Sequence, residues 1–374
     1  MNRRHIIYFA LFVFTSVIQG AERAALTFHV SPNGSDANAG TGPEDAKALR
    51  TIQTAVNRMS PGDICFIRGG VYRETIIFPR SGEAGKPITL AAYRDEKPVV
   101  SGCEPVTGWT RHRDNIYKAP MTWTLGTGRN QVFVDKEVYI EARHPNVPEK
   151  GYEMYVADLS PLWPSFAEFS IVDPKSNAGR IVSKLLEGQP DDHWKGALYY
   201  GVHFEGWAAQ TGVIEGSKSG EIIVGDRTKG WWFGPIYGGN YKPEEGRGMI
   251  VGHMNALDMP GEWHWQDNTL YLIPKGNGPT DAPLPSGVEA KKRQLAFDLS
   301  GREHIHIKGI RIKAASMNLQ DSAYCVIDGC QFAYISHFLR QYSVGQIENG
   351  RDTIRSGETG IFIGGHDNSF LNTS

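Results

Sequence analysis

Short apolar runs separated by polar turn residues occupy much of the chain. Early runs lie at residues 27–30, 64–67, 75–78, 88–91 and 99–100. Short strands that follow one another at intervals of about ten residues are typical of sandwiches, barrels and β-solenoids. The pattern therefore predicts an all-β protein built from many short strands.

One amphipathic helix interrupts this pattern. Leu49, Ile52, Val56 and Met59 recur at spacings of three and four residues, which places them on one helical face. The helix is expected to end at Ser60-Pro61-Gly62, because proline lacks the backbone N–H that a helix interior needs.

A weak internal repeat marks the last part of the chain. Residues 304–312 superpose on residues 324–332 with a shift of 20, which places Ile307 on Ile327. Residues 368–372 echo the second copy 44 residues further on, which fits two coils of 22 residues or one coil with a long loop. Periods near 20 are typical of a parallel β-helix, in which equivalent side chains stack from coil to coil.

The middle of the chain differs in composition. All 9 tryptophans lie between residues 107 and 291, and this sharp change indicates a separate module. Residues 262–272 read as a β-hairpin with its turn at Asp267-Asn268. Antiparallel strands of this kind predict a β-sandwich.

The first part of the chain resembles a known superfamily. Pro61-Gly62-Asp63, an apolar strand and then residues 69–74 (Gly-Gly-Val-Tyr-Arg-Glu) resemble the first coil of right-handed parallel β-helix proteins of the pectate-lyase-like superfamily. The segments that match the usual N-terminal cap of this superfamily are the loop 30–41, the helix 50–56 and the stretch 82–101. The tryptophan-rich segment is similar to a β-sandwich inserted into the β-helix of some glycoside hydrolases.

The resemblance implies an all-β fold: a right-handed parallel β-helix with an N-terminal capping helix and an inserted β-sandwich. The last residues look like the middle of a coil, so we expect further coils, and part of the catalytic apparatus, beyond residue 374. The predicted parts are a signal peptide (1–20), the cap and first coils (21–106), the inserted sandwich (107–291) and continuing, truncated coils (292–374).

The N-terminus and the charge balance restrict location and partners. Arg3 and Arg4 precede an apolar run over residues 6–18, and small residues follow, which is the layout of a secretory signal peptide. We expect a secreted or periplasmic monomer with no membrane span after cleavage. The 39 Lys and Arg residues against 41 Asp and Glu residues argue against a nucleic-acid partner, which would need a basic surface.

The four cysteines are expected to be free, buried thiols. Cys325 and Cys330 are five residues apart, and in an extended strand this spacing would place them on opposite faces. No Cys-x-x-Cys or nearby His spacing indicates a zinc site, so we expect no metal centre.

The resemblance implies carbohydrate chemistry, and the acidic residues near the end of the chain are the candidates for it. Retaining glycosidases use two carboxyl groups roughly 5–5.5 Å apart. The densest polar stretch is 348–367. We predict Glu358 as acid or nucleophile and Asp352 or Asp367 as its partner; a solvated loop is the alternative interpretation.

Other residues are predicted to contact substrate. Arg340, Arg355 and His337 are candidates for a base or a substrate clamp. Trp207, Trp231 and Trp232 offer flat aromatic faces that suit the C–H faces of sugar rings, unless they fill the core of the module instead.

We therefore expect a glycoside hydrolase that cleaves a plant or algal polysaccharide or oligosaccharide with two carboxylates and no cofactor. One alternative is a pectate- or alginate-type polysaccharide lyase that needs Ca²⁺. The other alternative is a carbohydrate-binding β-helix protein without catalytic activity.

Overall fold

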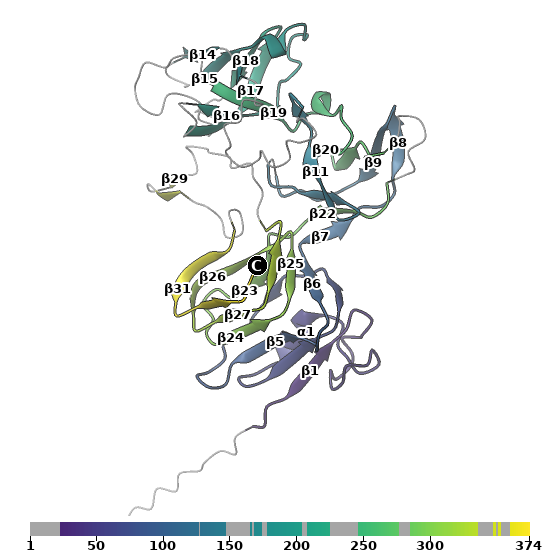
Figure 1. The fold of residues 1–374 in the computed structure, drawn as a ribbon, viewed down its shortest axis with the longest axis vertical. Helices are drawn as coiled ribbons and strands as arrows, with labels where there is room; N and C mark the ends of the chain where they lie inside the picture. Colours follow the sequence, from purple (N-terminus) through teal and green to yellow (C-terminus); the bar gives the residue numbers. More distant parts are fainter. Residues whose placement is uncertain are drawn as a thin grey trace, which may run out of the picture.

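Strands dominate the computed structural model of the protein (Figure 1). It describes residues 23–126, 128–146, 165–166, 168–173, 178–203, 208–224, 246–276, 285–335, 347–348, 351–352 and 360–374. The predicted signal peptide lies outside these residues. Within the described residues, no helix is long and apolar enough to cross a membrane.

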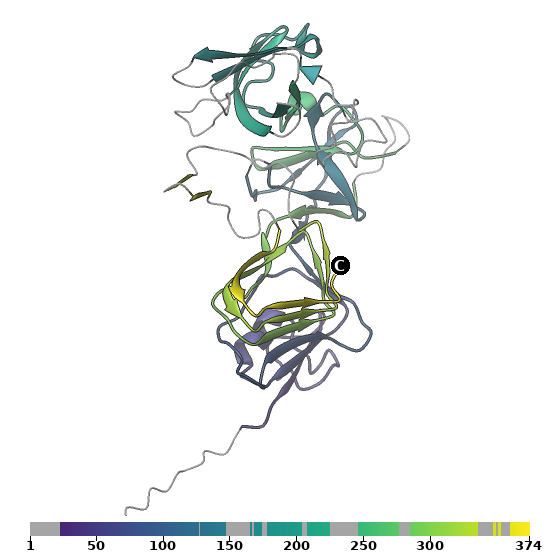
Figure 2. The ribbon, with the colours of Figure 1, turned by 60° about the vertical axis from the view of Figure 1, so that its left-hand side comes forward.

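Three sheets contain only parallel pairs. The first parallel sheet comprises β1 (Thr27–Val30), β2 (Ile64–Ile67), β5 (Ile88–Ala92), β24 (Ile305–Lys308), β27 (Val326–Asp328) and β32 (Ser369–Leu371). The second comprises β3 (Gly70–Tyr72), β6 (Pro98–Ser101), β25 (Arg311–Lys313) and β28 (Gln331–Ala333). The third comprises β4 (Ile76–Ile77), β23 (Leu295–Asp298), β26 (Ser316–Ala323) and β31 (Phe362–His366). The chain visits the three sheets in turn, and they lie together in the lower part of the molecule (Figure 2).

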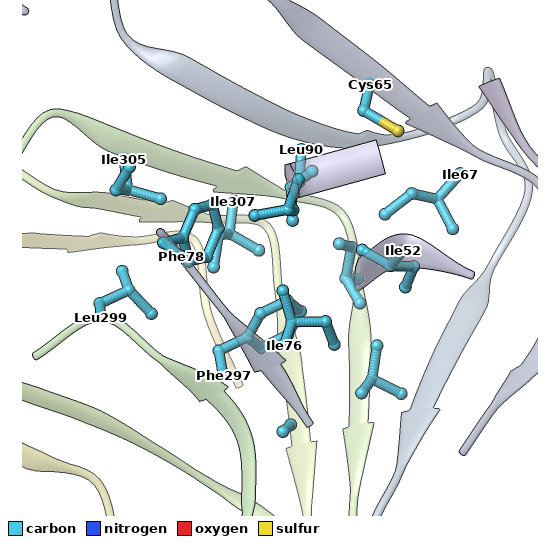
Figure 3. Packing of buried hydrophobic residues seen from close by; sticks show 14 of the residues in the cluster. Ile52, Cys65, Ile67, Ile76, Phe78, Leu90, Phe297, Leu299, Ile305 and Ile307 are labelled. Carbon is cyan, nitrogen blue, oxygen red and sulfur yellow. The ribbon is translucent and has the colours of Figure 1, made fainter. Parts of the chain in front are cut away.

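The three parallel sheets share one hydrophobic core (Figure 3). Leu90 and Ile307 from the first sheet, Ile76 and Phe297 from the third, and Ile52 from the helix α1 (Ile52–Arg58) all point into it. Each is fully buried, and burying such a side chain contributes about 1.5–3 kcal/mol. The predicted helix therefore exists, and its apolar face covers the core.

A threonine and a glutamate fix the start of α1. The side chain of Thr51 accepts a hydrogen bond from the backbone N–H of Thr54. The carboxylate of Glu74 accepts the N–H groups of Ile52 and Gln53, both at 2.9 Å. These bonds satisfy N–H groups that have no partner inside the helix.

The internal repeat corresponds to strand pairing. Ile307 pairs with Ile327, as the 20-residue shift predicts. Ile327 in turn pairs with Phe370, so the third copy is offset by 43 residues rather than 44. Between β27 and β32, the described residues contain one strand of the second sheet, β28, and one strand of the third, β31. Because β27 also pairs directly with β32, the third copy follows the second after one turn through the three sheets, and not after two coils of 22 residues.

Two eight-stranded sheets occupy the connection from β6 to β23. The fourth sheet comprises β7 (Cys103–Pro105), β22 (Val288–Lys291), β10 (Val132–Val134), β11 (Glu137–Glu141), β20 (Glu262–Gln266), β21 (Thr269–Leu272), β9 (Ile116–Pro120) and β8 (Thr110–Arg113). The fifth comprises β12 (Arg143–His144), β19 (Gly246–Val251), β16 (Leu198–His203), β17 (Ala208–Lys218), β18 (Glu221–Val224), β15 (Ala178–Val182), β14 (Glu168–Asp173) and β13 (Ser165–Phe166). The described residues also include the short helices Lys184–Leu186 and Met254–Ala256 and the strands β29 (Ile347–Glu348) and β30 (Arg351–Asp352).

Tryptophans pack inside this middle region. Trp263 is buried in the core of the fourth sheet, and Trp194 is buried in the core beside the fifth. The hairpin of β20 and β21 turns at Asp267 and Asn268, which both have positive φ, as its sequence predicts. Trp194 and Trp263 therefore fill hydrophobic cores, whereas Trp207, Trp231 and Trp232, for which core filling was the alternative interpretation, lie outside the described residues.

All four cysteines are free and buried, as expected. The reasoning about Cys325 and Cys330 was wrong, however. Both side chains lie in the core of the parallel sheets, because the chain turns at Gly329 between them with a φ of 62°. The two cysteines are therefore not on opposite faces of one strand.

Candidate functional site

A groove of about 1340 Å³ lies over the outer face of the second parallel sheet. Its floor is formed by side chains of β3, β6, β25 and β28, and its opposite wall by β22 and the turn between β10 and β11. Figure 1 shows β7 and β22 directly above β6 and β25. The groove thus lies where the parallel sheets meet the fourth sheet.

Strand alternation decides which side chains form the floor. In β25, Ile312 points into the core, so Arg311 and Lys313 point outward. Register places Val99 beside Arg311, and Ser101 beside Lys313. Neighbouring strands are about 4.8 Å apart, so outward side chains from several strands line the same groove.

An ionic cluster joins the floor to the opposite wall. Glu289 of β22 pairs with Arg73, and its second carboxylate oxygen lies 2.7 Å from Nζ of Lys313. Arg73 also donates a hydrogen bond to the carbonyl of Cys103 at 2.8 Å. Nζ of Lys313 lies 4.6 Å from the centre of the Phe133 ring. Both cations are therefore already engaged by protein groups.

The cluster keeps Glu289 ionised. Burial raises the pKa of Glu289, but the hydrogen bonds and positive charges of Lys313 and Arg73 outweigh burial, so the pKa lies below its ordinary value. A carboxylate held in this state is a poor general acid.

Arg311 is held differently. Its Nε donates to the side-chain oxygen of Gln331 at 2.8 Å. Within the described part of the chain, its terminal nitrogens make no hydrogen bond or ion pair. Across the groove, Asp135 and Lys136 form a turn with positive φ at both positions. Arg311 and Lys136 are both exposed side chains of the groove lining.

A buried lysine lies near the groove. Lys291 has 2% of its surface exposed, and burial lowers its pKa to about 8. Its Nζ is 3.5 Å from the carbonyl oxygen of Ile335, which lies two residues after the end of β28. This contact links Lys291 to the segment that follows β28.

Glu262 is another group with a strongly shifted pKa, and it lies outside the groove lining. Burial raises the pKa of Glu262 to about 7. Its carboxylate accepts the N–H groups of Asp258 and Met259 at 3.2 and 3.1 Å. These contacts give Glu262 a structural role in the bend before β20.

The groove lining contains two acidic side chains among the described residues, Asp135 and Glu289. In the same part of the chain, no three His, Cys, Asp or Glu side chains gather in a way that could hold a metal ion. Because Glu289 is already bound by two cations, the described lining does not fit the oxygen-rich shell that calcium requires.

Asp367 lies apart from the groove lining. It occupies the turn between β31 and β32, with a φ of 53° and its carboxylate 3.0 Å from Nδ1 of His366. Asp352 belongs to β30, which pairs with β29, but its side chain is outside the described part of the structure. The other predicted site residues lie outside the described residues: Glu358, Arg340, Arg355, His337, Trp207, Trp231 and Trp232. Their roles stay predictions.

The sequence analysis missed the charged residues of the groove. In Arg311-Ile312-Lys313, a polar–apolar–polar pattern within a short strand does place both cations on the outer face. Glu289 shows the same alternation in β22. No local signal, however, indicates that Glu289 meets Arg73, which is 216 residues away.

Comparison with solved structures identifies a protein that shares this fold. A solved glycoside hydrolase superposes with a TM-score of 0.56 and 16% identity, over 83% of this chain and 65% of that one. The two chains share a fold. At this level of identity the likeness concerns fold alone.

Two curated proteins are similar over a shorter stretch. Pectate lyase PEL9 of Emericella nidulans is 42% identical over 82 residues, which is 21% of this chain and 19% of the lyase. Uncharacterized protein YwoF of Bacillus subtilis is 40% identical over 91 residues, which is 24% of this chain and 19% of that protein. The chain thus matches about a fifth of the length of these relatives. No family model matches the sequence.

Proposed function

We propose that this protein is a secreted carbohydrate-active enzyme that binds a polysaccharide in the groove over the second parallel sheet. In this proposal the three parallel sheets are the faces of a right-handed parallel β-helix, and residues 107–291 form an inserted β-sandwich. The shared fold with a solved glycoside hydrolase supports this interpretation.

The groove is the observation that carries the proposal. Pockets for small ligands usually measure about 300–1000 Å³, whereas this one measures about 1340 Å³. It is lined by apolar side chains, such as Val71 and Val99, together with charged ones. Apolar surface suits the C–H faces of sugar rings, and polar groups suit their hydroxyls.

The proposed reaction is hydrolysis of a glycosidic bond, in which water adds across the bond. One carboxylic acid would protonate the leaving oxygen, and a carboxylate would attack or activate water. Glu358 with Asp352 remains the proposed pair, since Asp367, the alternative partner, lies apart from the groove lining. Asp352 and Glu358 lie in sequence between Tyr334, which lines the groove, and Gly360, which precedes β31.

Cleavage of the polysaccharide by elimination, the reaction of a lyase, is a second candidate, because one curated relative is a pectate lyase at 42% identity over part of the chain. A lyase removes a proton beside a uronic carboxylate and expels the glycosidic oxygen, so its product carries a new double bond. The Ca²⁺ that such a lyase needs would have to be bound by residues other than the described groove lining.

Product analysis distinguishes the two reactions. The purified protein would be incubated with xylans, pectins and alginates, with and without EDTA, and assayed for reducing ends and for the ultraviolet absorbance of unsaturated products. We expect reducing ends without that absorbance. Absorbance that disappears with EDTA would establish a lyase instead, and no product on any polysaccharide would contradict an enzymatic role.

A further inference from the structure

We propose that His193, Asn255 and His253 form an acid-sensitive bridge between two turns, which holds while both imidazoles are neutral and opens when they take up protons. We call these three residues the histidine bridge. They lie in the connection from β6 to β23, beside the buried Trp194 and outside the groove lining. The inference therefore goes beyond the proposed function and does not depend on it.

Asn255 joins the two turns. Its backbone N–H donates to Nδ1 of His253 at 3.2 Å, and this bond caps the short helix Met254–Ala256. Its side-chain nitrogen lies 3.3 Å from Nδ1 of His193 and donates to the carbonyl oxygen of the same residue at 2.9 Å. One asparagine thus connects segments that are 62 residues apart in sequence.

These partners determine the protonation state of both rings. A carbonyl oxygen can only accept, so the atom of Asn255 that contacts the His193 carbonyl is the NH₂ group of the amide. The same group donates to Nδ1 of His193, and the backbone N–H donates to Nδ1 of His253, so neither Nδ1 carries a proton. A protonated imidazole has an N–H at both ring nitrogens, and each contact would then place one donor against another.

The histidine bridge covers Trp194, of which 2% is exposed. The ring of His193 stands edge-on to the indole, with 4.5 Å between the ring centroids, and His253 approaches to 6.1 Å. His144 of β12 stacks on the same indole at 5.0 Å. Because Trp194 belongs to the hydrophobic core beside the fifth sheet, opening the bridge uncovers part of that core.

The acidic groups near the bridge do not compensate a positive imidazole. Within the part of the chain that the structure describes, neither imidazole of the bridge forms an ion pair with a carboxylate. Asp192 binds Lys195 at 3.0 Å instead. Glu141 of β11 lies against Gly252, but burial raises its pKa to about 7, so near pH 5 this carboxyl group is mostly neutral.

Two further histidines of the described residues face the bridge. Nε2 of His144 lies 3.0 Å from the carbonyl oxygen of Leu185 and can donate there whether the ring is neutral or charged. A positive charge on His144 disfavours a second one on His193. His264 of β20 faces His253, and burial lowers its pKa to about 4, so it stays neutral near pH 5.

The sign of the pH effect follows from the folded state. Burial lowers the pKa of His193 and of His253 below the ordinary value of 6.5, and a neighbouring histidine lowers each further. The closed bridge therefore resists protonation, whereas opened imidazoles bind protons freely. The bridge is fully stable above the ordinary value and weakens as the pH falls below it.

The test measures opening where it is expected. Hydrogen exchange of peptides that cover residues 190–197 and 253–257 would be followed by mass spectrometry near pH 7.5 and pH 5, with rates corrected for the intrinsic effect of pH. Protection of these peptides in the native protein should fall at least about tenfold in acid, the effect of a shift of one pKa unit.

Variants identify the groups that take up the protons. His193→Gln together with His253→Asn keeps an acceptor oxygen in each position but cannot bind a proton, so its protection should be equal at both pH values. The control is His112→Gln, an exposed histidine on β8, which should keep the acid response of the native protein.

Equal protection of the native protein at both pH values would overturn the inference, and so would an acid loss in the double variant as large as in the native protein. A loss spread evenly over the three parallel sheets would indicate acid unfolding of the whole chain and would also overturn it. Circular dichroism checks folding. If the double variant does not fold, His253→Asn alone, which keeps a cap for the short helix, must reduce the acid loss.

Discussion

At the scale of single residues, the carboxylate of Glu289 connects two parts of the chain that are distant in sequence. It binds Arg73 before β4 and Lys313 in β25, and all three side chains have a quarter or less of their surface exposed. Hydrogen bonds to charged groups contribute about 1.5–3 kcal/mol when they are shielded from water. The contact therefore contributes to stability as well as to the shape of the groove.

We expect Glu289→Gln to lower the free energy of unfolding by about 1.5 kcal/mol near neutral pH, measured by urea denaturation. The pKa of Glu289 is lowered in the folded protein, so its contribution is present above the unfolded pKa of about 4.3 and is lost as pH falls further. The difference between variant and wild type should shrink below that pH.

A matched substitution at an exposed pair serves as the control. Glu137 pairs with Lys275 at 3.0 Å, and two thirds of the Glu137 side chain is exposed. Glu137→Gln should change the free energy of unfolding by less than about 0.5 kcal/mol, because exposed ion pairs are weak. Equal effects of the two substitutions would show that the cluster at Glu289 has no special role.

At the scale of elements, tight turns carry the chain from the first parallel sheet to the second. Gly309 and Gly329 occupy equivalent positions after β24 and β27, with φ values of 69° and 62°. Residues with a Cβ atom are strained in this left-handed region. The positive φ that each turn requires thus explains why the repeat has glycine at both positions.

Gly329→Ala should cost about 1 kcal/mol and lower the urea midpoint, because alanine resists positive φ. Space is not the cause, since an added Cβ would lie 3.9 Å from its nearest neighbour, the backbone nitrogen of Gly309. Gly329→Asn should cost less, since asparagine tolerates this conformation. An asparagine variant less stable than the alanine variant would contradict this explanation.

At the scale of the whole molecule, what sequence predicts depends on the range of the interaction. Strand positions, the helix and the pairing of Ile307 with Ile327 follow from periodicity, because the residues involved are close in sequence or repeat. The groove does not follow in this way. It arises where the connection from β6 to β23 brings Glu289 back over the second sheet, and no local pattern encodes that meeting.

The predicted acid pair shows a related limit. Two carboxylates about 22 residues apart would have indicated a pair stacked on successive coils. The long connection from β28 to β31, however, separates the third copy of the internal repeat from the second by more than one such interval. Asp367 then lies in a turn with His366, rather than on the outer face of the second sheet. Where long connections interrupt a repeat, positions within them have no register from which to be predicted.

The most direct test of the central claim, that the groove binds polysaccharide, is to fill it. Val71 lines the groove and is 48% exposed, and Ile77 on the third parallel sheet is 56% exposed but does not line it. Affinity for the best ligand among xylans, pectins and alginates would be measured for Val71→Trp and Ile77→Trp. The account predicts a loss of about tenfold or more for Val71→Trp and no change for Ile77→Trp, since a larger side chain blocks only the site it lines. Unchanged affinity in a folded Val71→Trp variant would contradict the claim.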